Sequence, residues 1–176
     1  MHSEPGAFWN WSIGIYGSNE LEAGLIALQD NEDADVNMML WCLWNAARGC
    51  EITAAGMTDA ARISDVWRSH AAAPLRAVRR WLKTSAATTI GEVSDLRNCV
   101  KQVELESERV QQDYLERIAP SPARTVPDVS QCLALVRKNL SIYARACAID
   151  QAALDATLSD ALLASILDAP TRVEEK

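Results

Sequence analysis

The stretch LQDNEDADVNMMLWCLWNAARG, from Leu28 to Gly49, is the part of the sequence on which the predicted fold depends. Its acidic and amide residues lead directly into a segment with two tryptophans and two methionines. Asp is a favoured N-cap residue, so Asp35 is expected to begin a helix over Val36–Arg48, and Gly49 to end it. This helix is apolar on most sides, which is typical of a helix buried among others.

The acidic part of the stretch matches a calcium-binding loop only at its start. Asp33, Asp35 and Asn37 have the spacing of the first three EF-hand ligands. The same loop needs glycine at position six and glutamate at position twelve, where this chain has Met38 and Trp44. We therefore interpret the acidic residues as a helix start, where negative charge favours the positive end of the helix dipole.

The composition favours helices throughout the chain. The 176 residues are enough for one domain with a core, and 49% of them are apolar. Glycine is scarce, and Ala, Leu and straight-chain polar residues dominate over β-branched and aromatic ones, which favours helix over sheet. All six tryptophans lie in the first half of the chain, so we expect the main core there.

The charge and the cysteines limit the possible partners and locations. A net charge of −7 argues against nucleic-acid binding. No apolar run is long enough to span a membrane, and the N-terminus lacks a secretory pattern, so we expect no membrane insertion and a cytoplasmic location. The five scattered cysteines form no C-x-x-C pair, and free thiols in a reducing compartment are the simplest interpretation.

Helical periodicity extends on both sides of the opening stretch. Further helices are expected over residues 7–16, 20–30, 58–83, 90–118 and 128–148, and one weaker helix or a pair of helices over 150–169. Pro74 lacks an amide donor, so it is expected to kink or break the helix 58–83 into two, with Val66, Val78 and Trp81 among the inward-facing residues. The predicted fold is all-α, a single-domain bundle of six to eight helices with no sheet.

The predicted domain organisation follows from the same pattern. The core helical domain spans residues 7–118, and three prolines mark a linker over 119–127. Helices in 128–169 are expected to pack on the core, and 170–176 to form a frayed tail.

The long helix, about 90–118, carries apolar residues at alternating steps of three and four, interrupted only by Ser107. This spacing is close to a heptad seam, which either neighbouring helices or a dimer partner would cover. The seam residues are Val93, Leu96, Val100, Val103, Val110 and Tyr114.

The sequence contains no motif of catalysis or metal binding. It lacks a G-x-S-x-G elbow, a glycine-rich phosphate loop and paired His or Cys ligands. Cys42 lies within the apolar helix, where a thiol is inert. We therefore expect no metal and no cofactor, and the sequence favours a protein that is not an enzyme.

Two groups of residues remain as candidate sites. One is a stripe of polar and aromatic side chains along the helix 36–48, which could line a pocket for an amphipathic ligand. The alternative is that its tryptophans are core residues and its polar groups bond neighbouring helix ends. The stripe consists of Asn37, Trp41, Trp44, Asn45 and Arg48.

The other group is a basic segment before the long helix. Arg76 and Arg79 could hold the anionic group of that ligand, while Arg80 and Lys83 could contact an acidic partner. The alternative is that these cations pair with the acidic long helix, where Glu104, Glu106 and Glu108 cluster.

Four segments carry a resemblance: FWNWSIGIYG, LIALQDNEDADVNMMLWCLW, PLRAVRRWLK and ELESERVQQ. Over about residues 8–118 they resemble an uncharacterised family of small proteobacterial proteins with the motifs F-W-x-[FW]-S, L-Q-D and D-V-N…W-C-x-W. The resemblance implies an all-α bacterial cytosolic protein and no particular reaction. The spacer NEDA, between Asp30 and Asp35, lacks the glycine that the family pattern leads us to expect. The site positions implied by the resemblance are Gln29, Asp30, Asp35, Asn37, Arg76 and Arg79.

Two functions remain open. The leading hypothesis is a non-enzymatic helical module that binds a protein partner, or a second copy, through the basic segment or the seam. The alternative is a binder of, or an enzyme acting on, an amphipathic anionic small molecule. In that alternative Trp41 and Trp44 line the pocket, Asn37 and Asn45 orient the ligand, and Arg76 and Arg79 hold its anionic group.

Overall fold

The computed structural model describes residues 6–84, 93–125 and 127–168, and within them the chain is all-α with no strand. The described residues form eight helices when α4, η1 and α5, which follow one another without a break, are counted as one. This confirms the predicted fold class. The helices are α1 (Ala7–Ile15), α2 (Asn19–Glu32), α3 (Val36–Ala47), α4 (Ala54–Trp67), η1 (Arg68–Ala72), α5 (Ala73–Trp81), α7 (Val93–Arg117), α8 (Val129–Cys147), α9 (Gln151–Thr157) and α10 (Asp160–Leu167).

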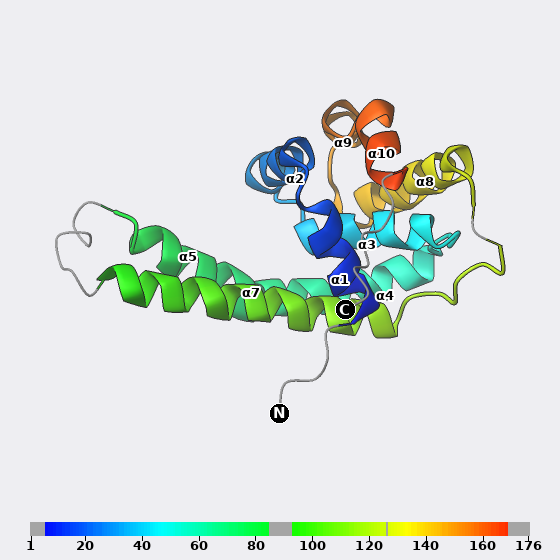
Figure 1. Ribbon diagram of the computed structural model, residues 1–176. Helices are drawn as coiled ribbons and strands as arrows, with labels where there is room; N and C mark the ends of the chain where they lie inside the picture. Colours follow the sequence, from blue (N-terminus) through cyan, green and yellow to red (C-terminus); the bar gives the residue numbers. More distant parts are fainter. Residues whose placement is uncertain (1–5, 85–92, 126, 169–176) are drawn as a thin grey trace, which may run out of the picture.

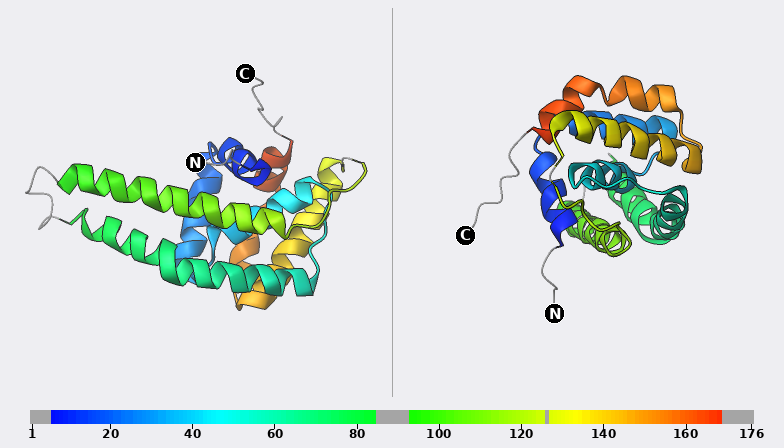
Figure 2. Two further views of the ribbon diagram at one scale, coloured as in Figure 1. Left: turned by 90° about the horizontal axis from the view of Figure 1, so that it is seen from below. Right: turned by 90° about the vertical axis from the view of Figure 1, so that its right-hand side faces the viewer.

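The helices form layers around α3. The continuous helix α4–η1–α5 and the long helix α7 lie side by side as a hairpin (Figure 1). Helices α1, α2 and α3 lie on one side of this hairpin, and α8 and α10 pack beyond α3 (Figure 1). Seen from below, the hairpin lies in front of the other described helices, so none of them covers that side (Figure 2).

Helix α3 is buried over almost its whole length, as its apolar sequence predicts. Ten consecutive residues, 37–46, are buried, and the Trp44 ring stacks on Phe8 of α1 with the ring centroids 5.0 Å apart. Apolar side chains of α8, α9 and α10 belong to the same core cluster. The described residues after 127 therefore share one core with the helices before 118.

Both ends of α3 form as the sequence predicts. The Asp35 carboxylate accepts the backbone N–H groups of Asn37 and Met38 at 2.8 and 3.3 Å, which is an N-cap. At the other end Gly49 has a φ of +73°, and a Cβ there would lie 2.7 Å from that of Ala123. Glycine is needed at this position for both reasons. The proline-rich segment packs against the helix end that Gly49 forms.

Asp35 also connects four helices. Its second carboxylate oxygen accepts the Ser64 hydroxyl of α4 and, at 2.9 Å, the Gln111 side-chain amide of α7. Its backbone N–H donates to the Tyr143 hydroxyl of α8 at 2.7 Å. The residue that begins α3 therefore also fixes α4, α7 and α8 around it.

The expected break at Pro74 is replaced by a π-helical turn. The N–H of Ala73 donates to the carbonyl of Arg68, five residues back, so η1 widens the helix just before the proline. A wider turn accommodates a residue without an N–H, and the helix continues instead of separating into two pieces. The helix also begins before the expected residue 58, because Thr53 is its N-cap.

The seam predicted on the long helix does not face the core. Leu96, Val103 and Tyr114 are exposed, while Val93, Val100 and Val110 are partly buried. The buried face of α7 is mainly polar instead: it consists of Glu104, Ser107, Gln111, Gln112 and Leu115. The prediction that Val66, Val78 and Trp81 face inward is also wrong. All three side chains are exposed, and Trp81 is 63% exposed.

Some predicted segments lie partly outside the described residues. Helix α7 begins at Val93, and residues 90–92 of the predicted long helix are not described. The predicted tail 170–176 is likewise outside them. Among the described residues, no helix combines the length and the hydropathy that crossing a membrane requires.

Replacing Asp35 should show how far the fold depends on it. We expect Asp35→Ala to lower the free energy of unfolding by about 3 to 5 kcal/mol, because a helix cap is lost and two partly or fully buried donors lose their acceptor. Asp35→Asn retains a cap acceptor, so its free energy of unfolding should fall less than that of Asp35→Ala. Urea denaturation measures both.

Asp30→Ala is the matched control, because its carboxylate makes a surface ion pair with Arg80 at 2.9 Å. Such pairs contribute about 1 kcal/mol or less. Equal losses in the Asp30 and Asp35 variants would contradict the central role of Asp35.

Candidate functional site

A groove of about 610 Å³ lies between α1, α2 and α3 on one side and the α5–α7 hairpin on the other. Its rim is apolar and partly exposed, and its floor contains buried polar residues. The apolar part is formed by Trp9, Ile13, Tyr16, Ile26, Leu40 and Leu105. The polar part is formed by Ser12, Asn37, Arg76, Arg79, Glu104, Glu108 and Gln112, among others.

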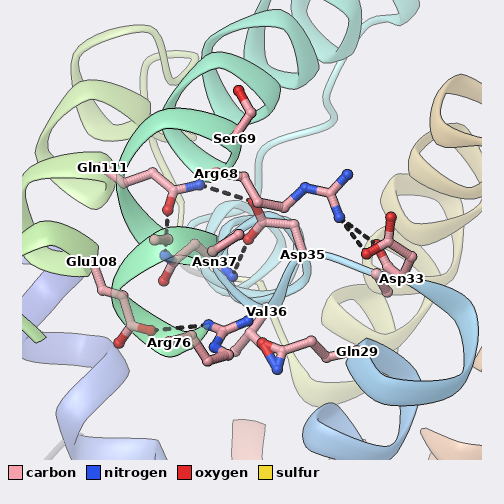
Figure 3. A pocket seen from close by; sticks show the side chains of 13 residues that line it. Gln29, Asp33, Asp35, Val36, Asn37, Arg68, Ser69, Arg76, Glu108 and Gln111 are labelled. Carbon is pink, nitrogen blue, oxygen red and sulfur yellow. Dashed lines mark hydrogen bonds and ion pairs between the residues drawn. The ribbon is translucent and has the colours of Figure 1, made fainter. Parts of the chain in front are cut away.

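Three side-chain amides form a relay that ends in the groove. Gln111 donates to the Asp35 carboxylate at 2.9 Å and accepts from the Asn37 amide at 2.7 Å. The Asn37 oxygen in turn accepts from the amide of Gln112 at 2.8 Å. Figure 3 shows Asp35, Asn37 and Gln111 turned toward one another. The relay connects the start of α3 with a polar atom on the groove floor.

Two buried polar atoms on the groove wall have no hydrogen-bond partner. They are the Ser12 hydroxyl oxygen and the Gln112 side-chain oxygen Oε1. Ser12 is 4% exposed and Gln112 is 2% exposed, so neither is freely hydrated. A buried polar atom without a partner is unusual and requires an explanation. Both residues line the groove.

Two arginines and two glutamates of the groove are paired with one another. Arg76 donates to Glu104 at 3.3 Å and to Glu108 at 3.4 Å. Arg79 also bonds Glu104, through both its Nε and its Nη2. The guanidinium groups are therefore already engaged by carboxylates. This is the internal pairing with the acidic long helix that was the sequence-based alternative.

Burial and neighbouring charges shift the pKa values of Glu108 and Tyr16 in the groove. Burial raises the pKa of Glu108; Arg76 lowers it, and the nearby carboxylates Glu104 and Asp35 raise it further. Burial also raises the pKa of Tyr16 to about 12, with Glu22 and Glu108 adding to the shift. The Tyr16 phenol therefore stays protonated at neutral pH and is available as a donor or an acceptor.

A smaller cavity of about 240 Å³ adjoins the groove and shares five lining residues with it. The shared residues are Gln29, Val36, Asn37, Arg76 and Glu108. The π-helical turn η1 forms one wall, and Figure 3 shows Arg76 and Glu108, two of the shared residues, pointing toward each other. Such π-helical turns are frequent at functional sites.

The structure separates the ligand-binding set that the sequence suggested. Asn37, Arg76 and Arg79 line the groove. Trp41, Trp44 and Asn45 are buried in the core and line neither cavity. Arg48 covers the Trp44 ring at 3.9 Å and donates to the Pro120 carbonyl at 3.2 Å, at the far end of α3. The tryptophans are thus core residues, as the alternative interpretation held.

The suggested partner-binding cations are more exposed. Arg80 pairs with Asp30 on α2, and Lys83 is exposed at the end of α5. The apolar partner candidates lie on α7, where Leu96, Val103 and Tyr114 are exposed.

The positions implied by the family resemblance gather around the two cavities. Gln29, Asn37 and Arg76 line both of them. Asp35 lines the smaller cavity and Arg79 the groove, while Asp30 lies outside in its surface pair with Arg80.

Sequence reasoning missed the residues that give the groove its chemistry. Ser64 carried no motif, Ser12 appeared only as the last residue of F-W-x-[FW]-S, and Gln111 and Gln112 only as the end of the segment ELESERVQQ. Glu108 was counted only as part of an acidic cluster. Polar residues at helical spacing look the same whether the face is solvated or buried against other polar groups. Among the described residues, no cluster of three or more His, Cys, Asp or Glu could hold a metal.

The raised pKa of Glu108 predicts a pH dependence of stability. A carboxyl that binds its proton more tightly when folded stabilises the fold below its unfolded pKa, near 4.5, and this contribution is lost as pH rises through the folded pKa. Relative to Glu108→Gln, the wild-type free energy of unfolding should therefore fall as the pH rises above the unfolded pKa and through the raised folded pKa. Urea denaturation across this range measures the difference. A difference that grows with pH would contradict the assignment.

The comparisons with known proteins give a family but no activity. A family model described as "Protein of unknown function (DUF2390)" matches residues 7–115, which include every helix that lines the groove. No curated protein and no solved structure matches the chain significantly. The matched region covers more than half of the chain, so this protein belongs to the DUF2390 family of proteins of unknown function.

Proposed function

We propose that this protein binds a small amphipathic molecule in the groove between α1, α2, α3 and the α5–α7 hairpin. The observation that carries the proposal is the pair of unpartnered atoms, Ser12 Oγ and Gln112 Oε1, on the groove wall. Leaving a buried polar atom unpartnered costs about 1 to 3 kcal/mol. A ligand that bonds both atoms would remove this penalty.

The shape of the groove supports the same proposal. Its volume of about 610 Å³ lies in the range of small-molecule sites, which are mainly apolar with a few placed polar groups. The exposed apolar residues Ile13, Ile26 and Leu105 all line it. A ligand lying between them would cover apolar surface that otherwise faces water.

We propose binding and not a reaction. The groove carboxylates Glu104 and Glu108 are engaged by Arg76 and Arg79, so each already has a charged partner within the protein. For the same reason the arginines are poorly placed to hold an anionic group, which the sequence-based hypothesis had assigned to them. A cytoplasmic location in a bacterial cell remains part of the proposal.

A second candidate function is self-association through the other side of the hairpin. Leu105 lines the groove, and Val103 lies about 200° away around α7, on the side that no described helix covers. On α5, Val78 and Trp81 each follow a groove residue, Arg76 or Arg79, by two positions. They therefore also lie about 200° around their helix from the groove. We call these exposed residues the outer face: Val78, Trp81, Leu96, Val103 and Tyr114.

The partner proposed for the outer face is the same face of a second copy. The three-and-four spacing on α7 is that of helices that interlock with one another. Antiparallel pairing of two α7 helices about a centre near Leu105 would place Leu96 opposite Tyr114, and Asp95 near Arg117 of the other copy. The face is thus complementary to itself, as a two-fold interface requires.

The groove proposal predicts where an apolar probe binds. N-phenylnaphthylamine, a neutral aromatic amine whose fluorescence rises in apolar surroundings, should bind the wild-type protein. Leu105→Arg places a charge on the groove rim and should weaken binding about tenfold or more. Fluorescence titration measures the dissociation constant.

Val103→Arg is the matched control, because Val103 is 55% exposed, Leu105 is 45% exposed and both lie on α7. It should leave probe binding unchanged. Loss of binding in Val103→Arg alone would place the probe on the outer face and contradict the groove proposal.

The same two variants also test self-association, but here Val103→Arg is the variant expected to lose it and Leu105→Arg is the control. If the outer face pairs with itself, light scattering after gel filtration should give a dimer for the wild type and for Leu105→Arg, and a monomer for Val103→Arg. A wild-type protein that stays monomeric at every concentration would rule out the second candidate function.

A further inference from the structure

We infer that the ligand of the groove presents a hydrogen-bond donor, an O–H or N–H group, to Gln112 Oε1, and that an anionic head group is excluded. This inference rests on the proposed groove and specifies which chemical class it takes. The ligand class is therefore an apolar molecule with an alcohol or amine head.

The direction of the amide relay fixes the chemistry of its last atom. The Asp35 carboxylate accepts four hydrogen bonds, and an ionised carboxylate has no proton to donate. Gln111 must therefore turn its NH₂ group toward Asp35 and its oxygen toward Asn37. Asn37 then turns its oxygen toward Gln112.

The last amide in the relay has only one orientation left. Gln112 uses its NH₂ group to donate to Asn37, so the free end of the amide is the oxygen Oε1. Rotating this amide by half a turn would place two oxygens against each other inside the protein. The atom at the groove is thus an acceptor, and it accepts only from a donor.

The Ser12 hydroxyl supports the same position for the ligand head. The α1 backbone N–H of Phe8 donates to Glu116 of α7 at 3.0 Å. Ser12 lies one turn further along α1, and Gln112 lies one turn back along α7. The two unpartnered atoms therefore occupy neighbouring turns of packed helices. A hydroxyl both donates and accepts, so Ser12 adds a second bond without changing the selectivity.

The charges near Gln112 also disfavour an anion. The groove contains Glu104 and Glu108, whose countercharges Arg76 and Arg79 are already paired with them. An anionic head beside Oε1 would face a carbonyl oxygen, and the other cation that lines the groove, Lys101, lies eleven residues away along α7, about 16 Å at the rise of a helix. An alcohol or an amine meets neither obstacle.

Three molecules with the same eight-carbon chain test the inference by displacing N-phenylnaphthylamine from the wild-type protein. We expect octanol and octylamine to displace the probe, and octanoate to require at least about a tenfold higher concentration. Octanoate competing as well as the other two would overturn the inference. Displacement by none of the three would also overturn it, while probe binding that depends on Leu105 would leave the groove proposal standing.

Two variants test whether Gln112 Oε1 and Ser12 Oγ contact the head of the ligand. Gln112→Met removes the acceptor and should weaken octanol binding about five- to tenfold and reduce the discrimination against octanoate. Because this change also removes the bond to Asn37, Ser12→Ala is the variant with little risk to folding. Ser12 has no partner to lose, so Ser12→Ala should unfold at the same or a higher urea concentration, yet bind octanol more weakly.

The results with the two variants decide whether the ligand head contacts Ser12 and Gln112. Weaker octanol binding by Ser12→Ala in a protein of undiminished stability supports a ligand head at these atoms. Octanol binding that is unchanged in both variants would overturn the inference, because neither atom would then contact the head.

Discussion

The structure depends on the carboxylate of Asp35. Each of its hydrogen bonds replaces one that the donor would otherwise make with water, and together they join the first turn of α3 to α4 and α7. A charged acceptor holds such donors more strongly than a neutral one. Because Tyr143 accepts the backbone N–H of the same residue, α8 is fixed at this point as well. The packing of the apolar core follows from these positions.

The hairpin reverses the usual distribution of polar and apolar side chains. The face of α7 that meets the rest of the protein carries Glu104, Gln111 and Gln112, while Leu96 and Val103 remain in contact with water. Buried polar groups need partners of specific geometry, whereas apolar contacts tolerate many arrangements. The hairpin is thus positioned by hydrogen bonds and ion pairs and not by an apolar seam. This leaves both an apolar outer face and a groove with a polar floor.

The groove and the fold are linked through the same groups. The relay from Asp35 to Gln112 passes from the most connected residue of the core to the wall of the groove. The chemical preference proposed for the groove is therefore a consequence of how α3 begins. The π-helical turn before Pro74 lies on the same side, where it forms a wall of the adjoining cavity.

The sequence by itself determined the all-α class and both ends of α3, because caps, periodicity and a terminal glycine act locally. It also determined that α3 is buried, since a helix apolar on most sides has no other favourable environment. Only the tertiary structure decided which face of α7 is inside, since its polar and apolar stripes both have helical spacing. The same limit explains why Trp41 and Trp44 were candidates for a pocket, while Ser12 and Gln112 were not. Whether a polar side chain is hydrated, paired or left for a ligand depends on what distant segments bring beside it.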